Sequence, residues 1–97
     1  MKKVFISSDH AGFNLKSSII KHCKNINFID CGCFNKKSVD YPDISKDLCE
    51  KFNKKESNFA ILICGSGVGM SISANKYKNI RAALCFDAEI AKLSRKH

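Results

Sequence analysis

The stretch Ile61-Leu62-Ile63-Cys64-Gly65-Ser66-Gly67-Val68-Gly69-Met70-Ser71 decides the fold of this 97-residue chain. The apolar run at 59–63 shows no polar alternation, which predicts a fully buried strand. Three glycines at every second position then follow a cysteine, and helical composition begins at Met70. A strand, a glycine loop and a helix together aim backbone N–H groups at one small anion. We therefore expect an anion-holding loop with Cys64 as a reactive thiol at its edge.

Composition and charge describe a single domain of an ordinary globular protein. The chain is 44% hydrophobic and 27% charged, and no apolar run approaches the length of a membrane span. The first residues enter a short strand rather than a signal peptide, so we expect a cytoplasmic protein with no membrane partner. The net charge is +8, but most of the 17 basic residues are lysines spread over every segment. This pattern favours a field that attracts an anionic substrate and argues against a nucleic-acid partner.

The six cysteines do not form a disulfide or zinc pattern. Cys31-Gly32-Cys33 has no second pair at zinc spacing, so no metal is expected. Four cysteines lie inside apolar helix or strand patterns and are predicted to be small buried hydrophobes in a reducing compartment: Cys23, Cys31, Cys49 and Cys85.

Strands and helices alternate along the chain. Strands are predicted at 3–7, 27–31, 59–63 and 80–85, helices at 13–23, 42–52, 68–76 and 87–97, and polar connections at 35–38 and 53–58. The alternation predicts an α/β fold, a doubly wound, Rossmann-like parallel sheet with helices on both faces and the strand order 2-1-3-4.

Apolar spacing predicts the buried side of each helix. Pro42 suits the first position of its helix, with Tyr41 extended before it, and Asp87 suits the N-cap of the last helix. Residues at helical spacing that are expected to face inward are Leu15, Ile19, Ile20 and Cys23 in the first helix, Ile44, Leu48, Cys49 and Phe52 in the second, and Ile90, Ala91 and Leu93 in the last.

Two polar loops are expected to meet at one edge of this sheet. Ser8-Asp9-His10 follows the first strand and Cys64-Gly65-Ser66-Gly67 follows the third, and ligands bind where the strand order reverses between such strands. This brings an acid, an imidazole, a thiol and an anion cradle into one crevice. Taken singly, Asp9 is equally well explained as a helix cap and His10 as a surface loop residue.

The glycine loop does not fit three better-known phosphate loops. Its spacing is G-x-G-x-G after the third strand, which argues against a dinucleotide site, and no Lys-Ser/Thr pair closes it as in a P-loop. Cysteine phosphatases have an arginine at the far end of their loop, where this chain has Val68-Gly69-Met70. A tight turn would explain one or two of the glycines, but three glycines together with Ser66 and Cys64 favour function.

Several motifs, in order, resemble the ribose-5-phosphate isomerase B family, which also contains galactose-6-phosphate isomerase subunits. They are Ser7-Ser8-Asp9-His10-Ala11-Gly12, Asp40-Tyr41-Pro42, the stretch from Ile61 to Lys76, and Leu93-Ser94-Arg95-Lys96-His97. The resemblance implies interconversion of ribose 5-phosphate and ribulose 5-phosphate in the pentose phosphate pathway, through a cis-enediolate and without metal or cofactor. It also implies a homodimer whose sites lie between the subunits.

The same resemblance assigns a role to each residue of the candidate site. Cys64 is expected to move a proton between C2 and C1 of the open-chain sugar. The Ser66 hydroxyl and the main-chain amides of three glycines are expected to hold the enediolate: Gly65, Gly67 and Gly69. Asp9 and His97 are expected to open the furanose ring. His10 is expected to contact the phosphate, and Tyr41 to line the pocket.

Family members continue beyond the position of His97. The continuation carries a fifth strand, a helix that clasps the partner, and arginines that bind phosphate. We therefore expect residues 1–97 to be a single phosphosugar isomerase domain that is incomplete at its C-terminal end. Two alternatives stay open, an isomerase of galactose 6-phosphate and a non-catalytic remnant that binds phosphosugars.

Overall fold

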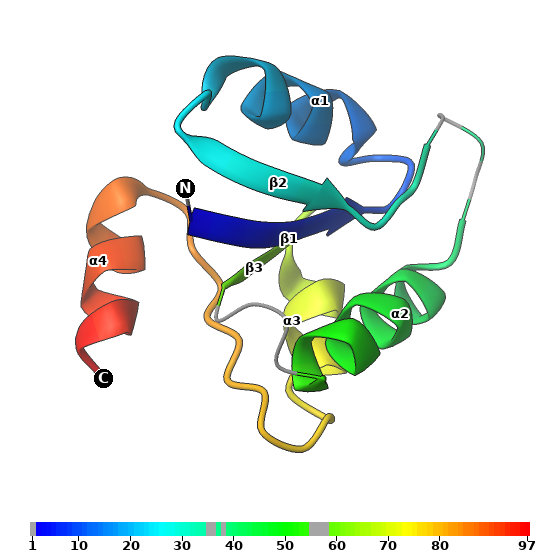
Figure 1. Ribbon diagram of the computed structural model, residues 1–97. Helices are drawn as coiled ribbons and strands as arrows, with labels where there is room; N and C mark the ends of the chain where they lie inside the picture. Colours follow the sequence, from blue (N-terminus) through cyan, green and yellow to red (C-terminus); the bar gives the residue numbers. More distant parts are fainter. Residues whose placement is uncertain (1, 35–36, 38, 55–58) are drawn as a thin grey trace.

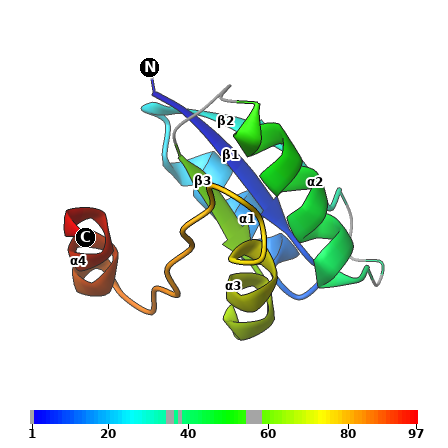
Figure 2. The same ribbon diagram turned by 90° about the horizontal axis from the view of Figure 1, so that it is seen from below.

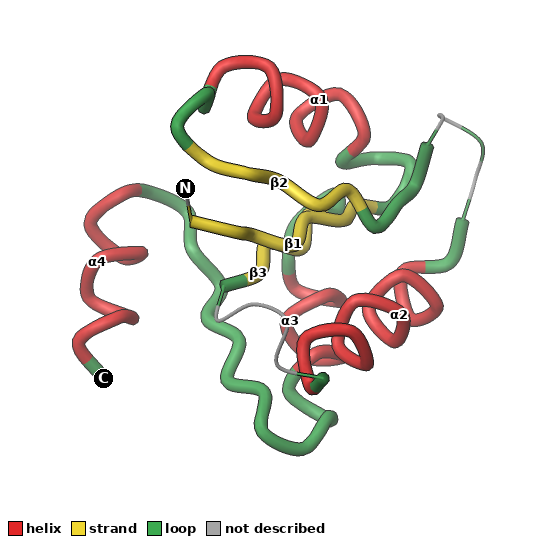
Figure 3. The backbone as a smooth tube through the Cα atoms, viewed as in Figure 1, coloured by secondary structure: helices red, strands yellow, loops and turns green. Residues whose placement is uncertain are grey.

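The chain folds into a three-layer α/β/α arrangement. The computed structural model describes residues 2–34, 37, 39–54 and 59–97, so the predicted connections at 35, 36, 38 and 55–58 lie outside it. The elements are β1 (Lys2–Ser8), α1 (Phe13–His22), β2 (Ile26–Asp30), α2 (Tyr41–Asn53), β3 (Ala60–Ile63), α3 (Val68–Ala74) and α4 (Ala88–Lys96). Helix α1 lies on one face of the sheet, and α2 and α3 lie on the other (Figures 1 and 3).

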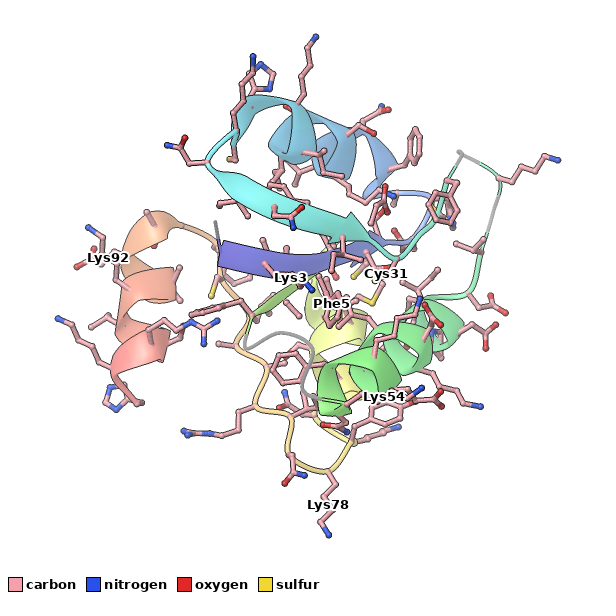
Figure 4. All side chains as sticks on the ribbon, viewed as in Figure 1. Lys3, Phe5, Cys31, Lys54, Lys78 and Lys92 are labelled. Atoms are coloured by element: carbon pink, nitrogen blue, oxygen red, sulfur yellow. The ribbon has the colours of Figure 1, made fainter. Side chains whose placement is uncertain are left out.

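The sheet is parallel, with β1 in the centre and the order β2-β1-β3. Central position explains why β1 is the most deeply buried element: Phe5 and Ile6 are almost completely enclosed. Figure 4 shows Phe5 in the middle of the molecule, on the side of the sheet that faces α2. The α/β class and the order of the first three strands are confirmed.

The predicted fourth strand is absent from this sheet. Residues 80–85 are irregular, and the described residues form three strands. Within this segment the Asn75 side chain binds the backbone of Ala82: its amide oxygen accepts from the Ala82 N–H at 2.9 Å and its amide nitrogen donates to the Ala82 carbonyl at 2.9 Å. The segment is thereby tied to the end of α3, and it makes no ladder with β3 among the described residues.

Because β3 lies at the edge of the described sheet, it is not the fully buried strand that its composition predicted. Ile61 is 36% exposed, whereas Ile63 is buried. The burial predicted for α1 is also wrong in part. Leu15 is 57% exposed and Cys23 lies exposed beyond the end of the helix, while Lys16 is buried. Ile61 and Leu15 both border one open cavity, and nothing in the described chain fills it.

Helix α4 begins as predicted, whereas α2 begins at Tyr41, one residue before the predicted start at Pro42. Asp87 caps α4, its Oδ1 accepting from the Ile90 N–H at 2.8 Å. The inward face predicted for α4 is wrong within this chain, because Ile90 and Leu93 are exposed. Figure 2 gives the reason, since α4 stands to one side of the sheet and does not cover it.

The predicted burial of cysteines holds for Cys49, is partial for Cys31 and fails for Cys23 and Cys85, which are exposed. Cys23 follows the last turn of α1, and Cys85 lies in the irregular segment that replaces the fourth strand. None of the helices in the described part of the chain is long and apolar enough to cross a membrane.

We predict that Gly12→Ala lowers the free energy of unfolding by about 1–3 kcal/mol, because overpacking forces backbone to move. A Cβ at Gly12 would lie 2.6 Å from Ile63 Cγ2 and 2.9 Å from the Ile63 carbonyl oxygen. Gly65→Ala is the matched control, since its Cβ would meet only Ala11 Cβ at 3.7 Å. Urea unfolding of both variants is the measurement, and equal stability of the two would contradict the prediction.

Candidate active site

The register of β1 and β3 brings the two polar loops together. Ser8 pairs with Ile63, so the next residues along the two strands are Asp9 and Cys64. The Asp9 N–H extends the ladder by donating to the Ile63 carbonyl at 3.1 Å. The turn after Asp9 also lies close against β3, because Gly12 has no room for a side chain beside Ile63. The predicted meeting of an acid and a thiol therefore rests on strand pairing.

Asp9 is both a turn residue and a buried acid. Its Oδ1 accepts from the Gly12 N–H at 3.0 Å, which is the local cap that the sequence left open as an explanation. Asp9 as a whole is only 8% exposed, which is unusual for an acidic residue unless its carboxylate is well hydrogen-bonded. One oxygen is thus fixed by the turn, and no described residue is shown hydrogen-bonded to the other.

The glycine loop holds the Cys64 sulfur at its entrance. Cys64 Sγ accepts from the Gly67 N–H at 3.1 Å. Gly67 has a φ of 82°, a left-handed conformation that favours glycine. A Cβ there would also lie 2.5 Å from Leu84 Cδ1, so the irregular segment after α3 packs directly on the loop. In this structure the Gly67 amide therefore donates its hydrogen bond to the Cys64 sulfur. That the same amide binds an enediolate oxygen stays a prediction.

The other donors of the loop are available to a ligand. Ser66 Oγ accepts from the Val68 N–H at 3.2 Å, which fixes the oxygen and leaves its hydrogen free to donate. Among the described residues, no acceptor is bonded to the amides of Gly65 and Gly69. One hydroxyl and two amides can thus donate to an oxyanion next to the sulfur.

Tyr41 and His10 close the loop region from the α2 side. The Tyr41 ring packs against Gly69, where a Cβ would lie 2.8 Å from Tyr41 Cζ. His10 is exposed, and its Nδ1 lies 3.2 Å from the Val39 nitrogen and accepts its hydrogen. The neutral imidazole therefore carries its proton on Nε2, which is free to donate outward.

His97 is the one predicted site residue that the structure does not bring to this region. It lies exposed at the end of α4, and its carbonyl accepts from Arg81 Nη2 at 2.8 Å. In both Figure 1 and Figure 2 the C-terminus lies to one side of the sheet, away from the loops that follow β1 and β3. Asp9 and His97 therefore do not meet within one chain.

A cavity of about 660 Å³ begins at the glycine loop and continues beside β3 toward α4. Cys64 and Ser66 line its polar end, and apolar residues such as Ile61 and Leu84 line the rest. Arg95 reaches its far end and stacks on the Phe59 ring, 4.4 Å from the centroid. Arg81 and Ser94 add polar groups at the end near α4, and Asp9, His10 and Tyr41 do not line the cavity. We take the loop end as the candidate site because the register of β1 and β3 sets the residue after Ser8 next to Cys64 there.

Charge and metal-binding groups add little to this site. Figure 4 shows Lys3, Lys78 and Lys92 on different elements and at separate places, so these lysines do not share one face. No group of three His, Cys, Asp or Glu side chains in the described ranges converges on a point where a metal could bind.

Sequence reasoning missed the backbone groups that hold the site. The Ile63 carbonyl and the Val39 N–H carry no signal in their side chains. Lys16 did carry a signal, because it lies three and four residues before Ile19 and Ile20 on the inner side of α1. A charged residue at an apolar position is a mark of a buried polar contact.

The chain resembles known sugar phosphate isomerases over its full length. A model of the Ribose/Galactose Isomerase family matches residues 4–97. Ribose-5-phosphate isomerase B of Escherichia coli is 40% identical over 99 residues, covering 100% of this chain and 66% of that protein. The ribose 5-phosphate isomerase of Thermotoga maritima superposes with a TM-score of 0.94 at 45% identity, covering 99% of this chain and 68% of that one. For ribose-5-phosphate isomerase B of Clostridium thermocellum the TM-score is 0.92 at 43% identity, with 98% and 66% covered. The chain thus spans about two thirds of the length of these relatives.

We predict that Cys49 reacts with iodoacetamide at pH 8 at least about tenfold more slowly than the exposed Cys85, because the thiolate is the nucleophile. Burial raises the pKa of Cys49, so less of it is ionised at that pH, and its sulfur is also enclosed. Mass spectrometry of timed digests measures both rates. Equal rates would contradict the burial of α2 against the sheet.

Proposed function

This chain belongs to the ribose/galactose isomerase family, and we propose that it interconverts ribose 5-phosphate and ribulose 5-phosphate by proton transfer through an enediolate. One observation carries the proposal. The β1–β3 register sets Asp9 beside Cys64 at the mouth of a loop with unpaired donors. An aldose–ketose isomerase needs a base next to fixed donors, because negative charge develops on the sugar oxygens as the proton leaves carbon.

Cys64 is the proposed base. Its thiolate takes the proton from C2 of the open-chain aldose, and the electron pair forms the C1–C2 double bond while the C1 oxygen becomes negative. The hydroxyl of Ser66 and the amides of Gly65 and Gly69 donate to the enediolate oxygens. The O2 proton then passes to the C1 oxygen, the electron pair left on O2 forms the C2=O double bond, and the C1–C2 π pair takes the proton back from the thiol at C1, which gives the ketose and restores the thiolate. The Gly67 amide, bonded to the sulfur, stabilises the thiolate before it takes the proton and after it has returned it.

The remaining roles follow from what is left unpaired around this centre. Asp9 has a carboxylate oxygen that the turn does not use, and we assign it to proton transfer during ring opening. His10 offers Nε2–H to the phosphate, because Nδ1 is occupied by Val39. Tyr41 lines the opening against Gly69. The substrate is a small phosphorylated sugar, and neither a metal nor a cofactor takes part in any of these steps.

A homodimer with its sites between subunits is part of the proposal. The second group for ring opening, His97, lies away from Asp9 in its own chain, so we assign it to the site of a second copy. Exposed apolar side chains on α4 and next to it support an interface there: Phe86, Ile90 and Leu93. We also place the protein in the cytoplasm, where a reducing environment suits six free thiols.

We predict that Cys64→Ala lowers kcat for ribose 5-phosphate by about 10²–10⁴-fold, the usual contribution of a positioned general base, and leaves the fold intact. Cys23→Ala is the matched control, because that thiol is exposed and follows α1 on the other side of the sheet. Turnover is followed as ribulose 5-phosphate formed, and circular dichroism checks the fold. Turnover by Cys64→Ala at the wild-type rate would remove the assigned base.

Mixing two inactive variants tests the shared site. Cys64→Ala and His97→Asn chains, mixed in equal amounts, form about half hybrid dimers, each with one intact site if His97 crosses to the partner. We expect about a quarter of the wild-type activity to return. If His97 served its own chain, no hybrid site would be complete, and the mixture would stay as inactive as the separate variants.

The two alternatives are distinguished by substrate choice and by binding. Rates on ribose 5-phosphate and galactose 6-phosphate are compared side by side, and a clear preference for the hexose would transfer the assignment to the galactose branch of the family. Calorimetry with ribose 5-phosphate accompanies the assay. Binding without turnover would identify a phosphosugar-binding protein that does not catalyse.

A further inference from the structure

Lys16 is the one lysine that the described structure encloses almost completely. It lies in the first turns of α1, and only 1% of its side chain is exposed. Burying a lysine is costly unless its ammonium group is paired and hydrogen-bonded. A buried ion pair is in turn weak support for stability, because apolar side chains of similar size often stabilise a fold equally well. The contacts of Lys16 therefore call for an explanation other than stability.

The Lys16 ammonium group joins α1 to the segment that follows β2. Its Nζ donates to Asp30 Oδ1 at 2.7 Å and to the Cys33 carbonyl. It also lies 5.4 Å from the ring centroids of Phe13 and Phe34, within cation–π range. Four contacts from three parts of the chain fix the position of a single nitrogen atom.

The segment held by Lys16 in turn holds the end of β1. Asp30 Oδ1 also accepts from the Gly32 N–H at 3.0 Å, so the ion pair orders this turn. The Gly32 carbonyl accepts from the Ser8 N–H at 2.8 Å, and the Cys33 N–H donates to the Ser8 carbonyl at 2.9 Å. Both backbone groups of Ser8, the residue before Asp9, are therefore bonded to the segment that Lys16 fixes.

Lys16 is also connected to Asp9 from the other side. The Lys16 N–H donates to the Gly12 carbonyl at 2.9 Å in the first turn of α1. The Gly12 N–H donates to Asp9 Oδ1 at 3.0 Å. Asp9 thus lies between two short chains of hydrogen bonds: one leads to the Lys16 ammonium group, and the other leads to the Lys16 main chain and does not depend on the side chain.

We propose that Lys16 is a positioning residue for Asp9, holding the loop after β1 so that the free carboxylate oxygen faces the Cys64 side of the site. The proposal rests on the function proposed above for Asp9. The Lys16 side chain is too enclosed to touch the substrate, and its ammonium group acts through the segment that binds Ser8. Without its ammonium group the segment after β2 loses two bonds, and Asp9 gains freedom while the rest of the core keeps its packing.

Hydrogen exchange of single amides tests the proposal without any need for turnover. Lys16→Met keeps the length of the side chain and removes the charge, and Lys21→Met is the control, an exposed lysine of the same helix. In Lys16→Met we expect the Ser8 and Asp9 amides to exchange at least about tenfold faster, the effect of losing a hydrogen bond or two. Amides of α2 and all amides of the control should keep their wild-type rates.

Two exchange results would overturn the proposal. One is an unchanged rate at Ser8 and Asp9, and the other is an equal acceleration at every amide, which would show a purely global role. If Lys16→Met does not fold, Lys16→Gln replaces it, because glutamine keeps a donor for one of the two acceptors. The same comparison of loop and α2 amides then decides.

Kinetics provides the second readout. Asp9→Asn is expected to lower kcat on the cyclic sugar more than on an open-chain analogue, and Lys16→Met should show the same selectivity with a loss of at least about tenfold. The double variant should be no slower than Asp9→Asn alone. Fully additive losses would overturn positioning through Asp9. An Asp9→Asn variant with wild-type turnover would instead refute the role of Asp9 in the proposed function. The exchange experiment would still decide, independently of turnover, whether Lys16 orders the loop after β1.

Discussion

The site depends on the pairing of β1 with β3. With Ser8 opposite Ile63, the two strands end in step, and their first loop residues, Asp9 and Cys64, emerge side by side. A slip of one residue would turn every side chain of β3 to the other face of the sheet. The bond from the Asp9 N–H to the Ile63 carbonyl and the close contact of Gly12 with Ile63 both oppose such a slip. Strand register, rather than any single side chain, brings the acid and the thiol together.

The two edges of the sheet differ: the β2 edge is covered by bonded segments of the chain, and the β3 edge is open. The β2 side is closed by the ion pair of Lys16 and by backbone bonds from residues 32–33 to Ser8. The β3 side borders a cavity lined by apolar side chains, and α4 stands clear of the sheet there. Polar groups line both ends of this cavity, with Cys64 and Ser66 at the loop and Arg81 and Arg95 near α4. The proposed second copy that supplies His97 would approach from this open side.

Local sequence patterns were sufficient for the parts of the structure that are fixed by neighbours in the chain. The central strand, the caps of the helices and the loop after Ile63 follow from apolar periodicity, Asp87, Pro42 and the glycine spacing. The predictions failed where burial depends on distant partners. Leu15, Ile61 and Ile90 have apolar spacing but no cover in the described chain, and Lys16 is buried through partners far along the sequence. Residues 80–85 have strand composition, yet they form no ladder with β3 in the described chain. For the site, sequence identified the residue types, and only the coordinates showed that the Gly67 amide points at sulfur.

The central claim is that main-chain and hydroxyl donors of the glycine loop hold a negatively charged enediolate beside Cys64. Binding of a phosphorylated hydroxamate of ribose length, whose two oxygens imitate the enediolate, tests it most directly when combined with amide exchange. The account predicts binding at least about a hundredfold tighter than that of ribose 5-phosphate, as for other mimics of a reaction intermediate, with slowed exchange at the Gly65 and Gly69 amides. Binding no tighter than that of the sugar, or protection elsewhere with none at these two amides, would contradict it.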